Sequence, residues 1–332
     1  MAPKSATAIW QNDPQSSAAA AAAAAAPVQR CNVLANRDQP TALLMTTDSP
    51  PEVRCREIAA DDLDSIADLL TAGFPNPRNH WVRALKLLSL RVVPDGFPRY
   101  GYMLETRTAA VGVILLIFSR APDSGVVRCN GSAWYVAPAF RTFAALLLKK
   151  ILRHRVTHTD LWPSRHTLPT IEALGYKRFC SGSFAAIPVL AAGIGGTKVR
   201  RVVEASHPER FVPAADLPLL RDHESFGCFS LWCETRDKGY PFIFRRRFVK
   251  DLPLVPTAQL VYCTSLDDLV CLAGPVGRYL ALRGIPLMLI PANGPIPGLV
   301  GRFFGGKPMY YFGPEQPRVG DLAYTEVAMF GF

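Results

Sequence analysis

The chain has 332 residues, of which 49% are hydrophobic and 19% are charged. That length is enough for two ordinary domains, and the apolar share excludes a chain that is disordered throughout. The formal net charge of +10 lies entirely in residues 51–332, because residues 1–50 hold three basic and three acidic side chains. A basic body attracts nucleic acid, anionic lipid or the phosphates of a cofactor, and a solvated basic surface is the alternative.

The eight cysteines include no C-x-x-C pair, so the sequence does not support a structural zinc site, and we expect no bound metal. Most of them lie in apolar stretches, which favours buried side chains in a reducing compartment. No apolar run reaches the roughly 18 residues of a membrane-spanning helix. The first 30 residues lack the leucine-rich core of a signal peptide. We therefore expect a cytoplasmic protein without a transmembrane segment.

Residues 1–50 differ from the rest of the chain. Nine consecutive alanines run from Ala18 to Ala26. Alanine favours helix, but this tract has no amphipathic face with which to dock on a core. We expect residues 1–50 to form a disordered, alanine-rich N-terminal extension.

From residue 53 the hydrophobic pattern becomes regular, and residues 51–190 are predicted to form one domain. Alternating or continuous apolar runs predict strands, and apolar residues at helical spacing predict helices. The predicted strands are 53–58, 100–106, 110–118, 130–136, 157–162, 176–179 and 184–189. The predicted helices begin at Asp61 and near His80, and cover 142–154 and 167–174. Strand, helix and strand in succession imply parallel neighbours in the middle of the sheet.

Residues 191–204 are predicted to be a glycine-containing linker, and residues 205–332 then repeat the order of elements more loosely. The predicted helices here are 214–224, 266–283 with a break at Gly274-Pro275, and a short helix at 298–304. The predicted strands are 228–234, 241–248, 258–263, 286–290, 307–312 and 322–330. The pattern predicts an α/β protein with a mixed central sheet, flanking helices and two related units in tandem.

The most informative segment is Trp134-Tyr135-Val136-Ala137-Pro138-Ala139-Phe140-Arg141, where a predicted strand leads into a predicted helix. Free amides at the start of a helix, together with its positive dipole end, suit a pyrophosphate, and Arg141 adds charge there. The strand before the helix can pair through its backbone with an extended ligand that carries amides.

Residues 53–190 resemble the GNAT acyltransferase superfamily. The resemblance rests on the V-x-P-x-F-R pattern before an apolar helix, and on Glu172-Ala173-Leu174-Gly175-Tyr176, which is similar to the family's E-x-L-G-F segment. It implies that the pantetheine arm of acetyl-CoA or a longer acyl-CoA lies in a gap beside Tyr135, Val136 and Ala137. It also implies a pyrophosphate-binding loop that includes Arg141, Thr142, Phe143 and Ala144.

The sequence departs from the family pattern at several positions. Ala144 and Leu146 stand where the family has the glycines of its phosphate loop, and side chains there push phosphates away from the backbone. By spacing, Ser164 takes the position of an asparagine, and Ile171 that of a tyrosine which protonates the departing thiolate. We take Ser164 and His166 as candidate catalytic residues, since the pKa of a histidine lies near neutrality. His166 can equally cap the helix at Thr167 or face solvent.

Two segments of the second half are rival sites. Gly274-Pro275-Val276-Gly277-Arg278-Tyr279-Leu280 combines glycines with an arginine and is either an anion site at a helix start or a helix kink. The loop Asn293-Gly294-Pro295-Ile296-Pro297-Gly298 either shapes an acceptor pocket or is only a connector.

We expect an acyltransferase that moves an acyl group from acetyl-CoA or a longer acyl-CoA to an amine or hydroxyl of a small-molecule or conjugated acceptor, by direct attack on the thioester. A non-catalytic acyl-CoA-binding or regulatory module on a decayed GNAT fold is the alternative, favoured by Leu146 and Ile171. Nucleic-acid binding is a third option, which predicts a steep salt dependence. The basic clusters lack interleaved aromatic residues, so we expect no specific nucleic-acid partner.

Overall fold

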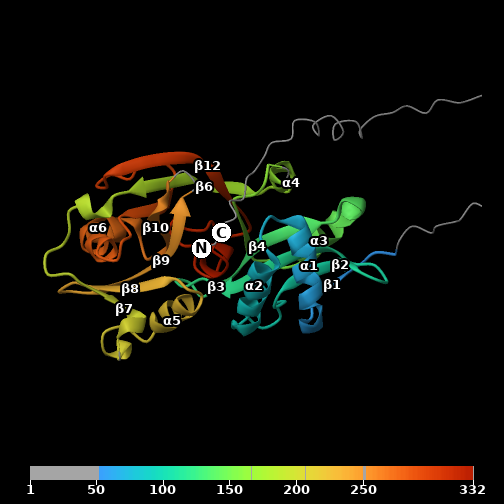
Figure 1. The fold of residues 1–332 in the computed structure, drawn as a ribbon, viewed down its shortest axis with the longest axis horizontal. Coiled ribbons are helices and arrows are strands. Elements are labelled where there is room, and N and C mark those ends of the chain that lie inside the picture. The colour runs from blue at the N-terminus through green and yellow to red at the C-terminus, as the bar shows by residue number, and fades with distance from the viewer. Residues whose placement is uncertain (1–51, 166, 206, 250–251, 332) are drawn as a thin grey trace, which may run out of the picture. The chain divides into compact units, whose positions relative to one another are not determined.

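The computed structural model describes residues 52–165, 167–205, 207–249 and 252–331. The predicted N-terminal extension, residues 1–50, lies outside the described residues, and so does His166. The remainder of the chain, Val53–Phe332, forms one compact unit (Figure 1).

The strands of this unit form one twelve-stranded mixed sheet with the order β1-β2-β3-β4-β5-β12-β6-β11-β10-β9-β8-β7. The strands are β1 (Arg54–Glu57), β2 (Gly101–Glu105), β3 (Ala110–Arg120), β4 (Val127–Val136), β5 (Thr157–Leu161), β6 (Lys177–Ala186), β7 (Lys198–Arg201), β8 (Phe229–Glu234), β9 (Gly239–Val249), β10 (Leu252–Cys263), β11 (Leu287–Ala292) and β12 (Gly301–Phe312). Among the described residues, parallel pairing occurs between β4 and β5 and between β10 and β11. The predicted parallel neighbours in the middle of the sheet are therefore confirmed.

The strand order is the same when counted from either end of the sheet. Strands β1 to β5 lead inward from one end, and β7 to β11 lead inward from the other. In the middle, β6 and β12 pair antiparallel with each other. Each also borders the other half of the chain, because β12 pairs with β5 and β6 pairs with β11. The last strand of each half is thus built into the sheet of the other half.

Helices cover both faces of the sheet. They are α1 (Leu63–Gly73), α2 (Arg78–Leu90), α3 (Ala144–Ile151), α4 (Leu168–Ala173), α5 (Leu217–Ser225), α6 (Leu266–Ala281) and α7 (Glu326–Met329). Helices α1 and α2 share a buried cluster with Val113 and Leu115 of β3, whereas α3 shares one with Leu116 and Phe118 of the same strand. Successive side chains of a strand point to opposite faces, so α3 lies on the face opposite to α1 and α2. Met329 of α7 belongs to the α1–α2 cluster, which places α7 on that face.

Several predicted elements differ from the observed ones. Residues 322–330, predicted as a strand, directly follow a single bridge between Tyr262 and Asp321 and include helix α7, because this apolar run packs between the two halves instead of joining the sheet. Most of the predicted helix 298–304 belongs to β12, which pairs with β6. The two predicted strands 176–179 and 184–189 are one strand, β6. Within the predicted linker, residues 198–201 are strand β7 and residues 202–204 form a 3-10 turn.

Helix α6 continues through Gly274-Pro275, and the predicted break is wrong. A Cβ atom on Gly274 would lie 2.6 Å from the Ala191 carbonyl oxygen, and one on Gly277 would lie 2.5 Å from the Pro188 backbone. The glycines therefore allow a neighbouring turn to pack on the helix. The prediction of a rival anion site at residues 274–280 is also wrong, because these glycines are buried in the middle of a helix and not at its start.

Candidate active site

Strands β4 and β5 pair over only four residues and then separate. The pairs run from Arg128 with Thr157 to Gly131 with Asp160. A β-bulge follows at Ala133, whose φ is +41°. A bulge bends a strand and increases its twist, so it turns β4 away from β5. The gap beyond Gly131 and Asp160 is called the β4–β5 fork below.

Beyond this point, one edge of β4 is open. Residues 132–136 pair with β3 along one edge, and on the edge toward β5 they have no strand partner among the residues that the structure describes. Trp134, Tyr135 and Ala137 keep part of their surface exposed, whereas Val136 is buried. The Tyr135 ring lies against Gly73, where a Cβ atom would approach the ring to 2.4 Å. An extended ligand can hydrogen-bond to an open strand edge of this kind.

The segment after β4 is a 3-10 turn (Pro138–Phe143), and α3 begins at Ala144. Of the residues predicted to bind the pyrophosphate, Arg141 and Thr142 are exposed, and Phe143 and Ala144 are partly buried. No acidic residue lies in the first turn of α3, so nothing there opposes an anion at its positive dipole end. The Leu146 side chain, at a position where the family has glycine, is 36% exposed.

Two carboxyl groups lie at the base of the β4–β5 fork. Asp160 is the last residue of β5 that pairs with β4, and Glu326 opens helix α7. The Ser132 hydroxyl of β4 donates a hydrogen bond of 2.5 Å to Glu326 Oε2, and the Glu326 amide donates to Asn130 Oδ1 at 2.9 Å. Glu326 is only 7% exposed. These contacts fix the Glu326 carboxyl against β4 where that strand leaves β5.

The pKa values of both carboxyls are raised. Burial raises the pKa of Glu326 to about 8, the Ser132 hydrogen bond opposes this, and the nearby charge of Asp160 adds to it. Burial raises the pKa of Asp160 to about 7. Near neutral pH a carboxyl with a pKa in this range can take up or release a proton. Raised pKa values of this kind are typical of functional sites.

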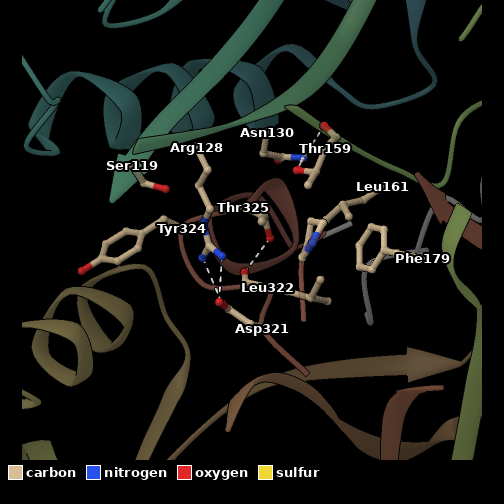
Figure 2. A pocket seen from close by; sticks show the side chains of 11 residues that line it. Ser119, Arg128, Asn130, Thr159, Leu161, Phe179, Asp321, Leu322, Tyr324 and Thr325 are labelled. Atoms are coloured by element: carbon tan, nitrogen blue, oxygen red, sulfur yellow. Dashed lines mark hydrogen bonds and ion pairs between the residues drawn. The ribbon is translucent and has the colours of Figure 1, made fainter. Parts of the chain in front are cut away.

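Glu326 reaches the fork because the C-terminal segment before it is anchored to β4. Arg128 Nη1 and Nη2 donate to the two carboxylate oxygens of Asp321 at 2.7 and 2.9 Å, and Nη2 also donates to the Ala323 carbonyl at 2.9 Å. Figure 2 shows Arg128 extending from its strand to Asp321. The cavity that these residues line has a volume of only about 10 Å³, so this centre is packed and leaves no room for a ligand.

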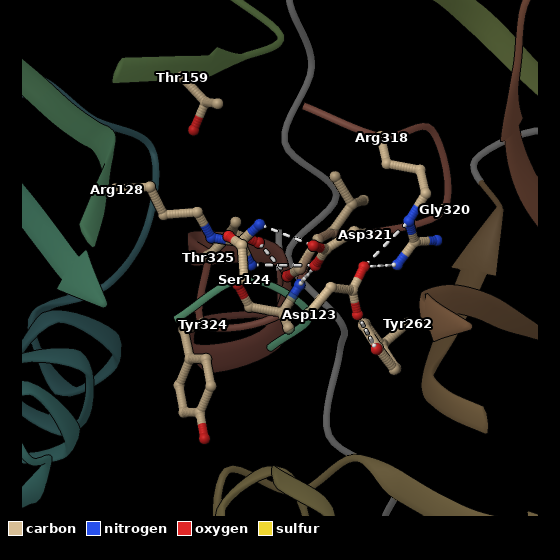
Figure 3. Close-up of polar contacts among 12 residues, drawn as sticks. Asp123, Ser124, Arg128, Thr159, Tyr262, Arg318, Gly320, Asp321, Tyr324 and Thr325 are labelled. Carbon is tan, nitrogen blue, oxygen red and sulfur yellow. Dashed lines mark hydrogen bonds and ion pairs between the residues drawn. The ribbon is translucent and has the colours of Figure 1, made fainter. Parts of the chain in front are cut away.

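The same segment is also attached to the loop after β3 and to β10. Arg318 Nη2 contacts Asp123 Oδ2 at 2.9 Å, and the Tyr262 hydroxyl donates to Asp123 Oδ1 at 2.6 Å (Figure 3). Arg318 Nη1 donates to the Cys263 carbonyl at 2.6 Å. The segment that carries Glu326 is therefore held by both halves of the sheet.

The predicted catalytic residue Ser164 is exposed. Its hydroxyl lies 2.8 Å from Thr167 Oγ1 and accepts a hydrogen bond from the Thr167 amide at 3.1 Å, an arrangement that stabilises the turn into α4. Ile171 is buried. A role of Ser164 and His166 in catalysis stays a prediction.

The carboxyls at the fork were missed in the sequence. Each leaves a signal, because Asp160 is the acidic residue of a short predicted strand and Glu326 interrupts an apolar run near the end of the chain. The placement of Glu326 against β4 is not visible there, since Ser132 and Glu326 are 194 positions apart.

Strands β10 and β11 form an equivalent fork in the second half, called the β10–β11 fork. Their parallel pairing extends only from Thr257 with Leu287 to Gln259 with Leu289. Beyond it, the Leu322 amide donates to the Val261 carbonyl at 2.7 Å, and the Cys263 amide donates to the Gly320 carbonyl at 3.1 Å. The chain's own C-terminal segment thus occupies the edge of β10 that corresponds to the open edge of β4.

A cleft of about 480 Å³ remains at the start of α6. It is lined by Leu266, Asp267, Val270, Cys271, residues 292–297 and Val319. Asp267 and Asp268 lie in the first turn of α6. Their charge disfavours phosphates at this helix start. The loop that begins at Asn293, predicted to be an acceptor pocket or a connector, lines this cleft.

Comparisons with known proteins support the fold. No protein-family model and no curated protein matches the sequence. A GCN5-related N-acetyltransferase from Anabaena variabilis matches with a TM-score of 0.52 and 11% identity, over 78% of this chain and 72% of its own. One from Kribbella flavida matches with a TM-score of 0.51 and 16% identity, over 79% and 71%. The fold is that of the GCN5-related N-acetyltransferases. A Pyrococcus horikoshii structure, solved as a candidate acetyltransferase, matches with a TM-score of 0.51 and 15% identity, over 82% and 95%.

The predicted GNAT fold, with its mixed sheet and flanking helices, is thus confirmed. In the part of the chain that the structure describes, no helix is long and apolar enough to cross a membrane. Nor do three or more His, Cys, Asp and Glu side chains gather there as metal ligands would.

Proposed function

We propose that the β4–β5 fork binds an acyl-CoA and that the chain transfers its acyl group to an amine or hydroxyl of an acceptor. One observation carries the proposal: an open strand edge leads to a helix start free of acidic residues, and two carboxyls with raised pKa values lie at the base of the gap. The pantetheine arm would pair with the backbone of Tyr135, Val136 and Ala137. Its phosphates would lie at residues 141–144.

The reaction requires one group that accepts a proton from the acceptor and one group that donates a proton to the departing thiolate. The acceptor nitrogen or oxygen attacks the thioester carbonyl carbon, the new bond forms, and the carbon–sulfur bond breaks. The carboxylate form of the Asp160–Glu326 pair accepts the proton that the acceptor loses, and the acid form protonates the departing thiolate. The pair then holds as many protons as before. Backbone amides near Val136 would polarise the carbonyl group during attack.

We further propose that residues 51–190 and 205–332 are two related GNAT-like units in tandem. Their equal strand order and equivalent forks support this division. Because β6 and β12 are exchanged, the boundary in the sequence does not coincide with a boundary in the sheet.

Leu146 at the phosphate loop and the buried Ile171 favour a second candidate function, a non-catalytic acyl-CoA-binding module. Both functions predict that acyl-CoA binds, and the enzyme alone predicts that CoA thiol is released when an acceptor is present.

The test is calorimetry and thermal unfolding of the chain with acetyl-CoA, decanoyl-CoA and free CoA. A ligand at about 100 times its Kd should raise the unfolding free energy by about 2.7 kcal/mol. Release of CoA thiol is then followed with a panel of amines and alcohols. Binding without acceptor-dependent thiol release supports the module, and the absence of binding by all three compounds contradicts both candidates.

A further inference from the structure

Three side chains from distant segments meet beside the β4–β5 fork. Trp162 directly follows β5, Arg247 lies in β9, and Lys307 lies in β12. The Arg247 Cζ atom lies 5.2 Å from the centre of the Trp162 ring, and the Lys307 Nζ atom lies 5.4 Å from it. These three residues are called the cation–tryptophan cluster.

Neither cation of the cluster has an acidic partner in the part of the chain that the structure describes. Among the described residues, no hydrogen bond or ion pair joins Arg247 or Lys307 to another side chain. Burial lowers the pKa of Arg247 to about 10, and the charge of Arg245 acts in the same direction. Burial also lowers the pKa of Lys307, with a further contribution from Arg247. The Arg247 side chain is half-buried, whereas Lys307 is exposed. A guanidinium partly removed from water without a counter-ion is costly, and a bound anion would offset that cost.

Trp162 adds two features of a binding site. Its indole Nε1 is buried and has no hydrogen-bond partner in the described part of the chain, although buried polar atoms are nearly always paired. Its φ is +64°, a left-handed conformation that is rare for a bulky residue. Strained residues of this kind tend to cluster at ligand sites. The cluster therefore offers two cations and one free N–H donor.

The cluster lies on one face of the sheet, and the proposed phosphate site of the acyl donor lies on the other. Arg245, two residues before Arg247 and hence on the same face of β9, donates to the Ala328 carbonyl of α7. The cluster thus lies on the α7 face, whereas α3, where the donor's phosphates would bind, lies on the opposite face. Trp162 is two residues from Asp160, about 7 Å along an extended chain.

We propose that the cation–tryptophan cluster binds an anionic group, a carboxylate or a phosphate, of the acyl acceptor. This rests on the proposed function and makes the acceptor an amine or alcohol that also carries a negative charge. The guanidinium of Arg247 and the ammonium of Lys307 bind the anionic oxygens, and Trp162 Nε1 donates a hydrogen bond.

The test compares acceptors that differ only in the anion. The two pairs are 4-aminobutyrate with 4-aminobutanamide, and O-phosphoethanolamine with ethanolamine. We expect a higher kcat/KM for the anionic member of at least one pair by about 10-fold or more, since hydrogen bonds to charged groups are worth about 1.5–3 kcal/mol. The carboxylate pair and the phosphate pair together show which anion is preferred.

Substitutions in the cation–tryptophan cluster test whether it causes the preference for anionic acceptors. Arg247→Gln and Lys307→Gln should each lower kcat/KM for the anionic acceptor and so reduce the preference about 10-fold. Arg247→Lys and Lys307→Arg keep the charge and should keep most of the preference, which separates loss of charge from misfolding. The matched control is Arg246→Gln, because Arg246 is exposed and lies over Phe248 on the other face of β9. This control should not change the preference.

Two further measurements separate this inference from the proposed function. If thiol release occurs but neutral acceptors react as well as anionic ones, the inference is wrong and the function stands. If Arg247→Gln weakens acyl-CoA binding and leaves acceptor preference intact, the cluster serves the donor's phosphates and the inference is overturned. If no acyl-CoA binds, the function fails. Binding of O-phosphoethanolamine to the wild type but not to Arg247→Gln, measured by calorimetry without acyl-CoA, would then still support the anion site.

Discussion

At the β4–β5 fork the edge of β4 beyond residue 131 has no strand partner among the described residues. At the β10–β11 fork the equivalent edge of β10 is paired by residues 320–322 of the same chain. The helix that follows the first fork opens without acidic residues, and the helix that follows the second opens with Asp267 and Asp268. A free edge and an uncharged helix start suit a ligand with amides and phosphates, and a paired edge and an acidic helix start do not.

The two forks share a topology but do not share a binding site. Both forks arise because two parallel strands pair briefly and then separate around a crossover helix. What differs is one stretch of chain near the C-terminus, which fills the second fork and brings Glu326 to the first. Function is therefore carried by the side chains and segments placed on the fold, and the fold alone does not specify it.

The largest expected effect is the loss of catalysis in Glu326→Gln. The amide keeps the shape of the side chain but cannot accept or supply the proton, so kcat should fall by about 100- to 10,000-fold. The pH dependence of kcat should change as well, which a purely structural effect would not cause. Asp267→Asn at the second fork is the matched control and should leave kcat unchanged. A wild-type pH profile in Glu326→Gln would exclude the carboxyl pair from the chemistry.

The second largest effect is expected from breaking the ion pair that anchors the C-terminal segment, and it tests whether this segment connects the two forks. Arg128→Met leaves the buried Asp321 carboxylate without its partner, and the unfolding free energy should fall by about 3–5 kcal/mol. Urea denaturation measures this change. The double variant Arg128→Met, Asp321→Leu removes both charges and should recover much of the loss. Equal stability of the single variant and the wild type would mean that the ion pair does not hold the segment.

The third effect is a pH dependence of stability that arises at the first fork. The folded protein raises the pKa of Glu326 to about 8 and that of Asp160 to about 7. Between about pH 5 and 7 the folded state therefore binds more protons than the unfolded state, and stability falls as pH rises. The slope is at most about 1.4 kcal/mol per pH unit for each group.

Glu326→Gln and Asp160→Asn should each flatten this dependence, as measured by denaturation at several pH values. Stability that rises from pH 5 to 7 through these residues would show that they are ionised in the folded state, contrary to the burial observed.

The smallest effect locates the donor. Ala144→Asp places a negative charge in the first turn of α3, where it should weaken acyl-CoA binding by about 10-fold through repulsion of the phosphates. An acidic residue near a helix start stabilises the helix, so folding should not suffer. Calorimetry measures the Kd. The matched variant at the other fork, Asp267→Asn, should leave the Kd unchanged, and an effect there would place the donor in the second half.

Local pattern was enough to predict most helices and strands and the parallel neighbours around α3, whereas the GNAT fold was predicted from the resemblance of two short motifs to that family. It succeeds because a strand or helix that buries one face must repeat apolar residues at its own period. The V-x-P segment likewise marks the end of β4, because proline cannot continue the ladder of a central strand.

Other features depend on segments far apart in the chain. These features are the exchange of β6 and β12, the contact of Glu326 with Ser132, and the convergence of Arg247 and Lys307 on Trp162. The apolar tail after residue 321 has the composition of a strand, yet it packs as a short helix against buried side chains of both halves. The period of the apolar residues shows which face of a helix or strand is buried. Which strand pairs at each edge, and which group lies beside each charge, depends on contacts between distant segments that form only in the folded chain.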